Sequence, residues 1–291
     1  MPADVSRFVE HLRLDYLPHT VLIDCTSSDA IAARYAEWLA AGIHIVTPNK
    51  KANSGDYGYY TRVLEARRAG GAHYLYQATV GAGLPVVTTL RDLLATGDDI
   101  SSIEGIFSGT LAYLFNAFDG ARSFSSIVHE ARQRGFTEPD PRDDLSGADV
   151  ARKLIILGRE MGLPLELKDV RVESLVPADL AAGSIEEFMA QLPRHDAAIA
   201  ARLAAARARG KVLRYTGRLT AAGEAAVGLQ EFDTDHVFAN IALTDNVVRF
   251  ATRRYCDNPL VIQGPGAGPE VTAGGVFADL LRLAAYLGAR L

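Results

Sequence analysis

The chain has 291 residues, 48% of them hydrophobic and 22% charged, which is the composition of a globular protein long enough for two domains. Its formal net charge of −5 argues against a nucleic-acid surface or a polybasic membrane anchor, so we expect neither kind of partner. No apolar run approaches the length of a membrane span, and the mixed, charged N-terminus does not have the pattern of a signal peptide.

The first part of the chain alternates apolar strands with helices. The predicted elements are, in order, a strand at 21–23, a helix within 27–42, a strand at 43–46 and a helix at 57–69. Ser27 or Ser28 is the expected N-cap of the first helix. This alternation predicts a parallel sheet, and ligands of such sheets bind at the carboxyl ends of the strands. Residues 26–28 and 47–50 fall there, so Lys50 is either the partner of an anionic ligand or a solvated loop lysine.

The middle of the chain is predicted to be mostly helical. A strand at 73–80 leads into the glycine turn GAGLP at 81–85, which is either a bend or a set of free carbonyls for a hard cation. The elements that follow are a helix at 85–97, a strand, turn and helix within 103–118, and helices at 125–135, 145–161 and 185–209. The turn at 108–110 is expected to cap its helix, a position that also suits a bound carboxylate.

Strands dominate the last part of the chain. The predicted segments are, in order, strands at 211–220, 225–232, 246–255 and 260–263, and a helix at 270–287. The first three predict an antiparallel meander, which we expect to extend one mixed sheet with strand 73–80. The glycine run at 264–268 does not match G-x-G-x-x-G, so it is either a phosphate-binding loop or a tight crossing from strand to helix.

Cysteine and histidine give no sign of a metal site. The two cysteines, Cys25 and Cys256, lie far apart and have no companion at ligand spacing. We therefore expect neither a disulfide framework nor a zinc site, and we expect a cytoplasmic location.

The most informative segment is TEPDPRDDLSGADVARK at 137–153, which combines a carboxylate cluster with the start of a helix. Positions i and i+4 share a helical face, so Asp149 and Lys153 should project the same way. An ion pair on a solvated surface is one interpretation. A lysine held in a cleft among carboxylates is the other, and such a lysine is a candidate proton carrier because its neighbours set its pKa.

Several segments in the same order resemble homoserine dehydrogenase. They are TPNKKA, ATVGAGLP, IEGIFSGTLAYLFNAF, FTEPDPRDDLSGADVARK, KVLRYTG and QGPGAGPEVTAGGVFADLLR. The resemblance implies an α/β fold with a partial Rossmann-type parallel sheet, an α/β catalytic domain and a mixed, strand-rich dimerisation region. It implies that residues 1–72, with 264–291 returning to them, bind NADP or NAD, and that 73–263 form the catalytic and dimerisation domain. The implied reaction is the interconversion of L-homoserine and L-aspartate 4-semialdehyde in threonine, methionine and isoleucine biosynthesis.

The resemblance also implies roles for individual residues. Those expected to carry acid/base chemistry are Lys153, Lys50 and Asp149. Those expected to contact the substrate are Glu138, Asp144, Thr110, Gly109 and Lys50. Those expected to contact the nucleotide are Thr26, Ser27, Lys50 and Gly268. Those whose carbonyls are expected to hold a sodium ion are Gln77, Val80, Ala82 and Leu84.

Three departures from the family pattern stand out. Phe136 replaces a tyrosine of some members, and Gln77 replaces an acidic residue of others. No G-x-G-x-x-G turn precedes Val21, so we expect a truncated or split chain, or one piece of an aspartokinase–homoserine dehydrogenase fusion. Such a chain is expected to bind NAD(P) weakly, and its preference between NAD and NADP is not predicted.

Two alternatives to this function remain open. One is a non-catalytic dimerising remnant of the same fold, and the other is a nicotinamide oxidoreductase that acts on a related amino acid. For the dehydrogenase we expect a homodimer, built through the strands at 211–255 together with 73–80.

Overall fold

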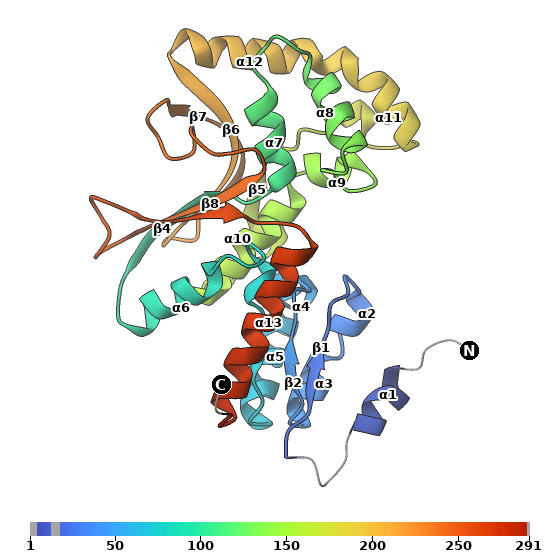
Figure 1. Cartoon of the computed structure of the whole chain (residues 1–291), viewed down its shortest axis with the longest axis vertical. Coiled ribbons are helices and arrows are strands. Elements are labelled where there is room, and N and C mark those ends of the chain that lie inside the picture. The colour runs from blue at the N-terminus through green and yellow to red at the C-terminus, as the bar shows by residue number, and fades with distance from the viewer. Residues whose placement is uncertain (1–4, 13–17, 290–291) are drawn as a thin grey trace.

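The computed structural model describes residues 5–12 and 18–289, which form two units around two separate sheets (Figure 1). The sheet of the first unit is parallel throughout, and its strands lie in the order β1 (Val21–Ile23), β2 (His44–Val46) and β3 (Tyr74–Leu75). The parallel sheet predicted for the first part of the chain is therefore confirmed, with β1 at the predicted residues.

The helices of the first unit include one that returns from the C-terminal part of the chain. They are α1 (Val5–Leu12), α2 (Asp29–Ala32), α3 (Tyr35–Ala40), α4 (Lys51–Ser54), α5 (Tyr57–Ala69) and α13 (Pro269–Tyr286). Figure 1 shows α13, in red, lying along the blue strands of this sheet. Ser28 is the N-cap of α2, where its hydroxyl accepts a hydrogen bond from the Ile31 N–H.

The single helix predicted within 27–42 is wrong, because a turn separates α2 from α3. Tyr35 opens the second piece, where its side chain is fully buried. Its hydroxyl donates to the Asp24 carboxylate at the end of β1. The turn thus goes with a buried hydrogen bond between Tyr35 and Asp24, which the spacing of apolar residues along the helix does not predict.

The strand predicted at 73–80 is also wrong in length and in partner. It ends at Leu75, and Gln77–Thr79 form a short 3-10 helix, η1. Gln77 donates its backbone N–H to an Asp279 carboxylate oxygen at 2.7 Å, and the Thr79 hydroxyl donates to the Tyr76 carbonyl at 2.7 Å. These side-chain contacts replace strand pairing, and β3 belongs to the parallel sheet rather than to the second one.

The second sheet is mixed, as predicted, and has six strands. They are β4 (Ile100–Ile106), β5 (Val170–Val172), β6 (Lys211–Thr220), β7 (Ala225–Asp233), β8 (Asp245–Thr252) and β9 (Leu260–Pro265). Their order is β5-β7-β6-β4-β8-β9, and only the β5–β7 pairing is parallel. The predicted meander is corrected because β4, whose Ile103 is fully buried, inserts between β6 and β8.

Helices surround the second sheet. They are α6 (Val86–Ala95), α7 (Gly109–Ala117), α8 (Phe124–Gln133), α9 (Pro141–Leu145), α10 (Ala148–Glu160), α11 (Ile185–Gln191) and α12 (Asp196–Ala208). Short 3-10 helices are η2 (Leu167–Asp169), η3 (Ala178–Leu180) and η4 (Leu192–His195). Helices α7, α10 and α12 all pack against β6. Among the described residues, no helix is both long and apolar enough to cross a bilayer.

Two of the predicted helices are broken. The helix predicted at 145–161 begins only after Gly147, which adopts φ +73° as the residue before α10. A Cβ at this glycine would lie 2.1 Å from the Tyr215 hydroxyl oxygen, so a side chain cannot replace it without movement. The helix predicted at 185–209 is interrupted by η4, which contains Pro193.

A buried arginine at the end of α10 ties the two units together. Arg159, only 4% exposed, donates to the backbone carbonyls of Asn53 at 2.9 Å, Gly55 at 2.6 Å and Leu165 at 3.0 Å. Asn53 lies in α4 of the first unit, so this side chain fixes α10 against that unit. Burial lowers the pKa of the guanidinium, while the nearby tyrosines and acidic groups act in the opposite direction.

We predict that Arg159→Met lowers the free energy of unfolding by about 3 kcal/mol, because it leaves three carbonyls without their charged donor. Urea unfolding followed by circular dichroism measures the change. The control is Arg207→Met on the exposed face of α12, which should change stability little. A loss below about 1 kcal/mol for Arg159→Met would show that the link is not structural.

Candidate active site

A pocket of about 910 Å³ lies between the two units, a volume at the upper end of the range for small-molecule sites. Residues of the first unit that line it include Ser27, Pro48 and Lys50. Residues of the second unit that line it include Ser108, Gly109, Thr110, Glu138, Asp144, Asp149, Arg152 and Lys153. The segment at 266–268 and Thr272 close a further side. The pocket therefore exists only because the units are docked.

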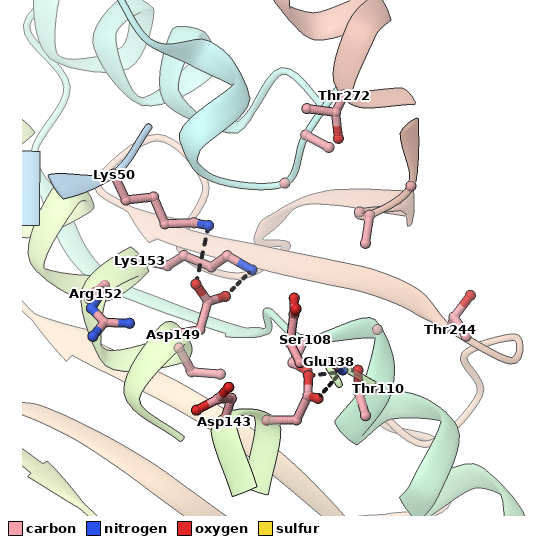
Figure 2. A pocket seen from close by; sticks show the side chains of 18 of the residues that line it. Lys50, Ser108, Thr110, Glu138, Asp143, Asp149, Arg152, Lys153, Thr244 and Thr272 are labelled. Atoms are coloured by element: carbon pink, nitrogen blue, oxygen red, sulfur yellow. Dashed lines mark hydrogen bonds and ion pairs between the residues drawn. The ribbon is translucent and has the colours of Figure 1, made fainter. Parts of the chain in front are cut away.

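One carboxylate at the centre of the pocket joins two lysines from different units (Figure 2). Asp149 lies 2.8 Å from the Lys153 ammonium nitrogen and 3.1 Å from that of Lys50. Asp149 and Lys153 share a face of α10, as their i, i+4 spacing predicts. Lys50 comes from the loop after β2, at the start of α4. A surface ion pair, the simpler interpretation of the sequence, does not describe Lys153, which is 8% exposed.

Burial decides the protonation behaviour of this cluster. Desolvation lowers the pKa of Lys153 from its ordinary value; the Asp149 charge opposes this and the Lys50 charge adds to it. Desolvation would raise the pKa of Asp149, but the two lysines outweigh it and hold that pKa well below its usual range. Lys153 also donates to the Phe107 carbonyl at 2.7 Å. The arrangement gives one lysine a lowered proton affinity at the pocket wall, next to a carboxylate that stays ionised.

The loop that delivers Lys50 is held by polar groups at the ends of β1 and β2. Asp24 is 4% exposed and accepts from the Asn49 side-chain amide at 3.0 Å. The Thr47 hydroxyl donates to the Asp24 carbonyl at 2.7 Å. Asp24 is not among the residues expected at this edge from the sequence, which are 26–28 and 47–50, although its place directly after an apolar strand is a signal for it.

A second carboxylate organises the opposite wall. One Asp144 oxygen lies 2.8 Å from the Thr110 hydroxyl, and the other accepts from the Glu138 backbone N–H at 2.8 Å. Burial raises the pKa of Asp144; the charges of Glu138 and Asp149 act in the same direction, while its hydrogen bonds oppose them. The Thr110 hydroxyl also lies 2.6 Å from the Phe136 backbone carbonyl. This contact does not depend on whether the ring of residue 136 carries a hydroxyl.

Most of the residues proposed from sequence reach this one pocket. Those that line it are Lys50, Asp149, Lys153, Glu138, Asp144, Gly109, Thr110, Ser27, Gly268 and Ala82. Those outside its lining are Thr26, Gln77, Val80 and Leu84. Thr26 instead shapes its own turn, with its N–H on an Asp24 carboxylate oxygen at 2.8 Å.

Arg152 is a pocket residue that sequence analysis missed, although it stands inside the DVARK motif. It lines the cavity, and no hydrogen bond or ion pair joins its guanidinium to another group of the described chain. Figure 2 shows it on the opposite side of Asp149 from Ser108 and Thr110. Its guanidinium is thus available to an anionic group that enters beside Lys50.

The carbonyls expected to hold sodium do not all fit a cation. The Leu84 carbonyl already accepts from the Val86 N–H at 2.7 Å and from the Gln77 side-chain amide. The Gln77 carbonyl accepts from the Val80 N–H at 3.4 Å. Within the described part of the chain, no group of three or more His, Cys, Asp or Glu side chains is arranged to bind a metal.

Comparison with known proteins covers both units. A family model described as homoserine dehydrogenase matches residues 85–281, and one described as the NAD binding domain of homoserine dehydrogenase matches residues 1–77. The chain is 48% identical to a homoserine dehydrogenase of Emericella nidulans over 276 residues, which is 91% of this chain and 75% of that protein.

Two further similarities extend over nearly the whole chain. It is 55% identical to a chloroplastic bifunctional aspartokinase/homoserine dehydrogenase of Zea mays, with 99% of this chain matched to 32% of that protein. The chain therefore spans about a third of the length of this bifunctional relative. A solved structure of a Candida auris protein of unknown function superposes with a TM-score of 0.93 at 42% identity, covering 98% of this chain and 81% of that one.

The two neighbours of Lys153 should move its pKa in opposite directions. Asp149→Asn removes the attraction that supports the ammonium, so the pKa of Lys153 should fall further. Lys50→Gln, the matched variant, removes a like charge, so the same pKa should rise. The 13C signal of the lysine ε-carbon followed against pH measures both, with Lys153→Arg identifying the signal. Shifts of the same sign in both variants would contradict the electrostatic account.

Proposed function

Because the chain belongs to the homoserine dehydrogenase family, we propose that it catalyses the NAD(P)-dependent interconversion of L-homoserine and L-aspartate 4-semialdehyde. This reaction is a step towards threonine, methionine and isoleucine. The observation that carries the proposal is the buried Lys153 beside Asp149, at a pocket shared by both units. A lysine with a lowered pKa suits proton exchange with a hydroxyl that becomes a carbonyl.

Lys153 is the proposed proton carrier. In the oxidation, its neutral amine takes the proton of the substrate hydroxyl while hydride leaves the carbon that carries this hydroxyl. In the reduction, its ammonium returns the proton to the carbonyl oxygen. A bound nicotinamide supplies or accepts the hydride. Contacts with Asp149 and the Phe107 carbonyl use two of the three donors of the ammonium, so one remains for the substrate oxygen. Asp149 holds both lysines in place and stays ionised throughout.

The amino-acid end of the substrate is proposed to bind at the opposite wall. The carboxylates of Glu138 and Asp144 suit its ammonium group. Gly109 and Thr110 begin α7, where backbone N–H groups suit its carboxylate. A Cβ at Gly109 would approach the Thr244 carbonyl to 3.1 Å, so the glycine lets the backbone of Thr244 pack closely against the start of α7.

The cofactor is proposed to lie on the side of the first unit. Ser27, Lys50 and Gly268 line the pocket there, Thr26 precedes them in the β1 turn, and Arg152 offers a cation for a phosphate oxygen. We propose that residues 1–75 with 266–291 form the nucleotide domain and 76–265 the catalytic domain. The boundary expected at 72/73 moves because β3 pairs with β2, and the one expected at 263/264 moves because β9 pairs with β8 as far as Pro265. We also propose a cytoplasmic location, supported by two cysteines that are both free.

Two alternatives are separable by simple measurements. A non-catalytic remnant would show no change in NADPH or NADH fluorescence on titration with the purified chain. An oxidoreductase for a related amino acid would bind the cofactor but turn over another hydroxy amino acid faster than L-homoserine. Saturable cofactor binding together with a preference for L-homoserine supports the proposed function over both.

We predict that Lys153→Ala, in the chain joined to a homologous segment that supplies the G-x-G-x-x-G turn, lowers kcat for L-homoserine oxidation on the order of 10²-fold or more, while the dissociation constant of NADPH changes little. NAD(P)H absorbance follows turnover and fluorescence follows binding. The control is Lys168→Ala, since the Lys168 side chain is 76% exposed in a surface ion pair. If the Lys153→Ala variant kept the kcat of the unmodified protein, Lys153 would not be the proton carrier.

We also propose a homodimer built on the six-stranded sheet. The support is β9, an edge strand whose outer side pairs with no other described strand and whose Val261 is 41% exposed. Residues 73–80 are left out of this interface because they do not belong to that sheet. Light scattering at micromolar concentration should give the mass of a dimer, and Val261→Lys should shift it towards the monomer. A monomeric unmodified chain would contradict the proposal.

A further inference from the structure

We infer that the side-chain amide of Gln77 takes the place of a bound sodium ion in the turn at 77–88, so that the fold of this chain does not depend on sodium. The inference goes beyond the proposed function, because it concerns how the turn beneath the pocket is held. It rests on the contacts of one buried side chain and on the hydrogen-bonding capacity of one carbonyl.

Gln77 is 2% exposed, and both ends of its amide are engaged. Its oxygen accepts from the Thr88 backbone N–H at 2.8 Å, and its nitrogen donates to the Leu84 carbonyl. A backbone N–H can only donate, so the amide oxygen must face Thr88 and the nitrogen must face Leu84. The hydrogen-bond network therefore fixes the orientation of the amide.

The Leu84 carbonyl has no capacity left for a cation. An amide carbonyl oxygen has two lone pairs, and here the Val86 N–H, at 2.7 Å, and the Gln77 amide occupy both. A sodium ion at this oxygen would meet the positive end of the amide dipole. To enter, it would have to expel the Gln77 side chain and break both hydrogen bonds of its amide at a buried site.

The same amide completes the start of α6. Pro85 is the N-cap of this helix and has no side-chain hydrogen-bond acceptor. The first N–H groups of the helix therefore receive no capping hydrogen bond from the N-cap residue. Thr88 is the third residue of the helix, and Gln77 supplies its acceptor from eleven positions earlier in the chain. Loss of the amide would therefore loosen both the turn and the helix.

A carboxylate in place of the Gln77 amide would make the turn require a bound cation. In Gln77→Glu one oxygen keeps the Thr88 N–H, but the other faces the Leu84 carbonyl oxygen, and two acceptors repel each other. A cation between them would relieve that repulsion, because hard cations are bound by carboxylate and carbonyl oxygens. The exchange of one NH₂ for one O⁻ should thus convert a turn that is independent of cations into one that needs a cation.

Thermal unfolding of the full chain tests this in sodium, potassium and choline chloride at equal ionic strength. The unmodified chain should have the same Tm in all three salts. Gln77→Glu should be less stable in choline chloride and should regain stability with sodium in a saturable way. The matched control is Gln133→Glu on the exposed face of α8, which makes the same change of charge without these contacts and should not respond to sodium.

Sodium-23 relaxation gives a second readout that needs neither catalysis nor cofactor. The line width should be the same for the unmodified chain and Gln133→Glu, and broader for Gln77→Glu. A saturable rise in Tm that is specific to sodium, or a broadened sodium line, in the unmodified chain would overturn the inference. So would a folded Gln77→Glu variant whose stability ignores sodium. If Gln77→Glu does not fold, the unmodified chain in the three salts still decides.

Discussion

The contact between one carboxylate and two lysines is the interaction on which the site depends. Asp149 lies 2.8 Å from the Lys153 nitrogen and 3.1 Å from that of Lys50. Lys50 and Lys153 come from different units, so the cluster forms only when the loop after β2 meets the start of α10. Coulomb attraction brings the three groups together, and burial of Lys153 prevents water from screening it fully. The chemistry and the docking of the two units are thus parts of one constraint.

Helix α10 serves the site at one end and the interface at the other. Its first turns carry Asp149 and Lys153, and its last turn carries Arg159 and Glu160. The Arg159 guanidinium donates to the carbonyls of Asn53 and Gly55 in the first unit, at 2.9 and 2.6 Å. A change in the tilt of this helix would therefore alter both the lysine cluster and the contacts that hold the units together. Two buried charged side chains, Lys153 and Arg159, lie along it, and both have close polar partners, because buried charges stabilise a fold poorly unless they are paired.

The returning helix α13 completes the pocket from the far end of the chain. Gly275 lies so close to the glycine turn that a Cβ there would be 2.6 Å from the Ala82 carbonyl oxygen. Asp279 accepts from the Gln77 N–H one turn later. These contacts place Gly268, at the start of α13, in the pocket wall. The glycine run at 264–268 therefore makes the tight crossing from β9 to α13 and faces the pocket.

The sequence by itself determined the features that local interactions control. Strand 21–23, helix 57–69 and the pairing of Asp149 with Lys153 follow from period and spacing within a few turns, and the motifs identified the family. The tertiary structure alone decided which distant segments meet: β3 with β2, β4 between β6 and β8, and Lys50 with Asp149. It also decided that a glutamine amide, rather than free carbonyls, lies at Leu84. The physical reason is that these outcomes depend on burial and on hydrogen-bond partners far away in the chain, which no local pattern of residues records.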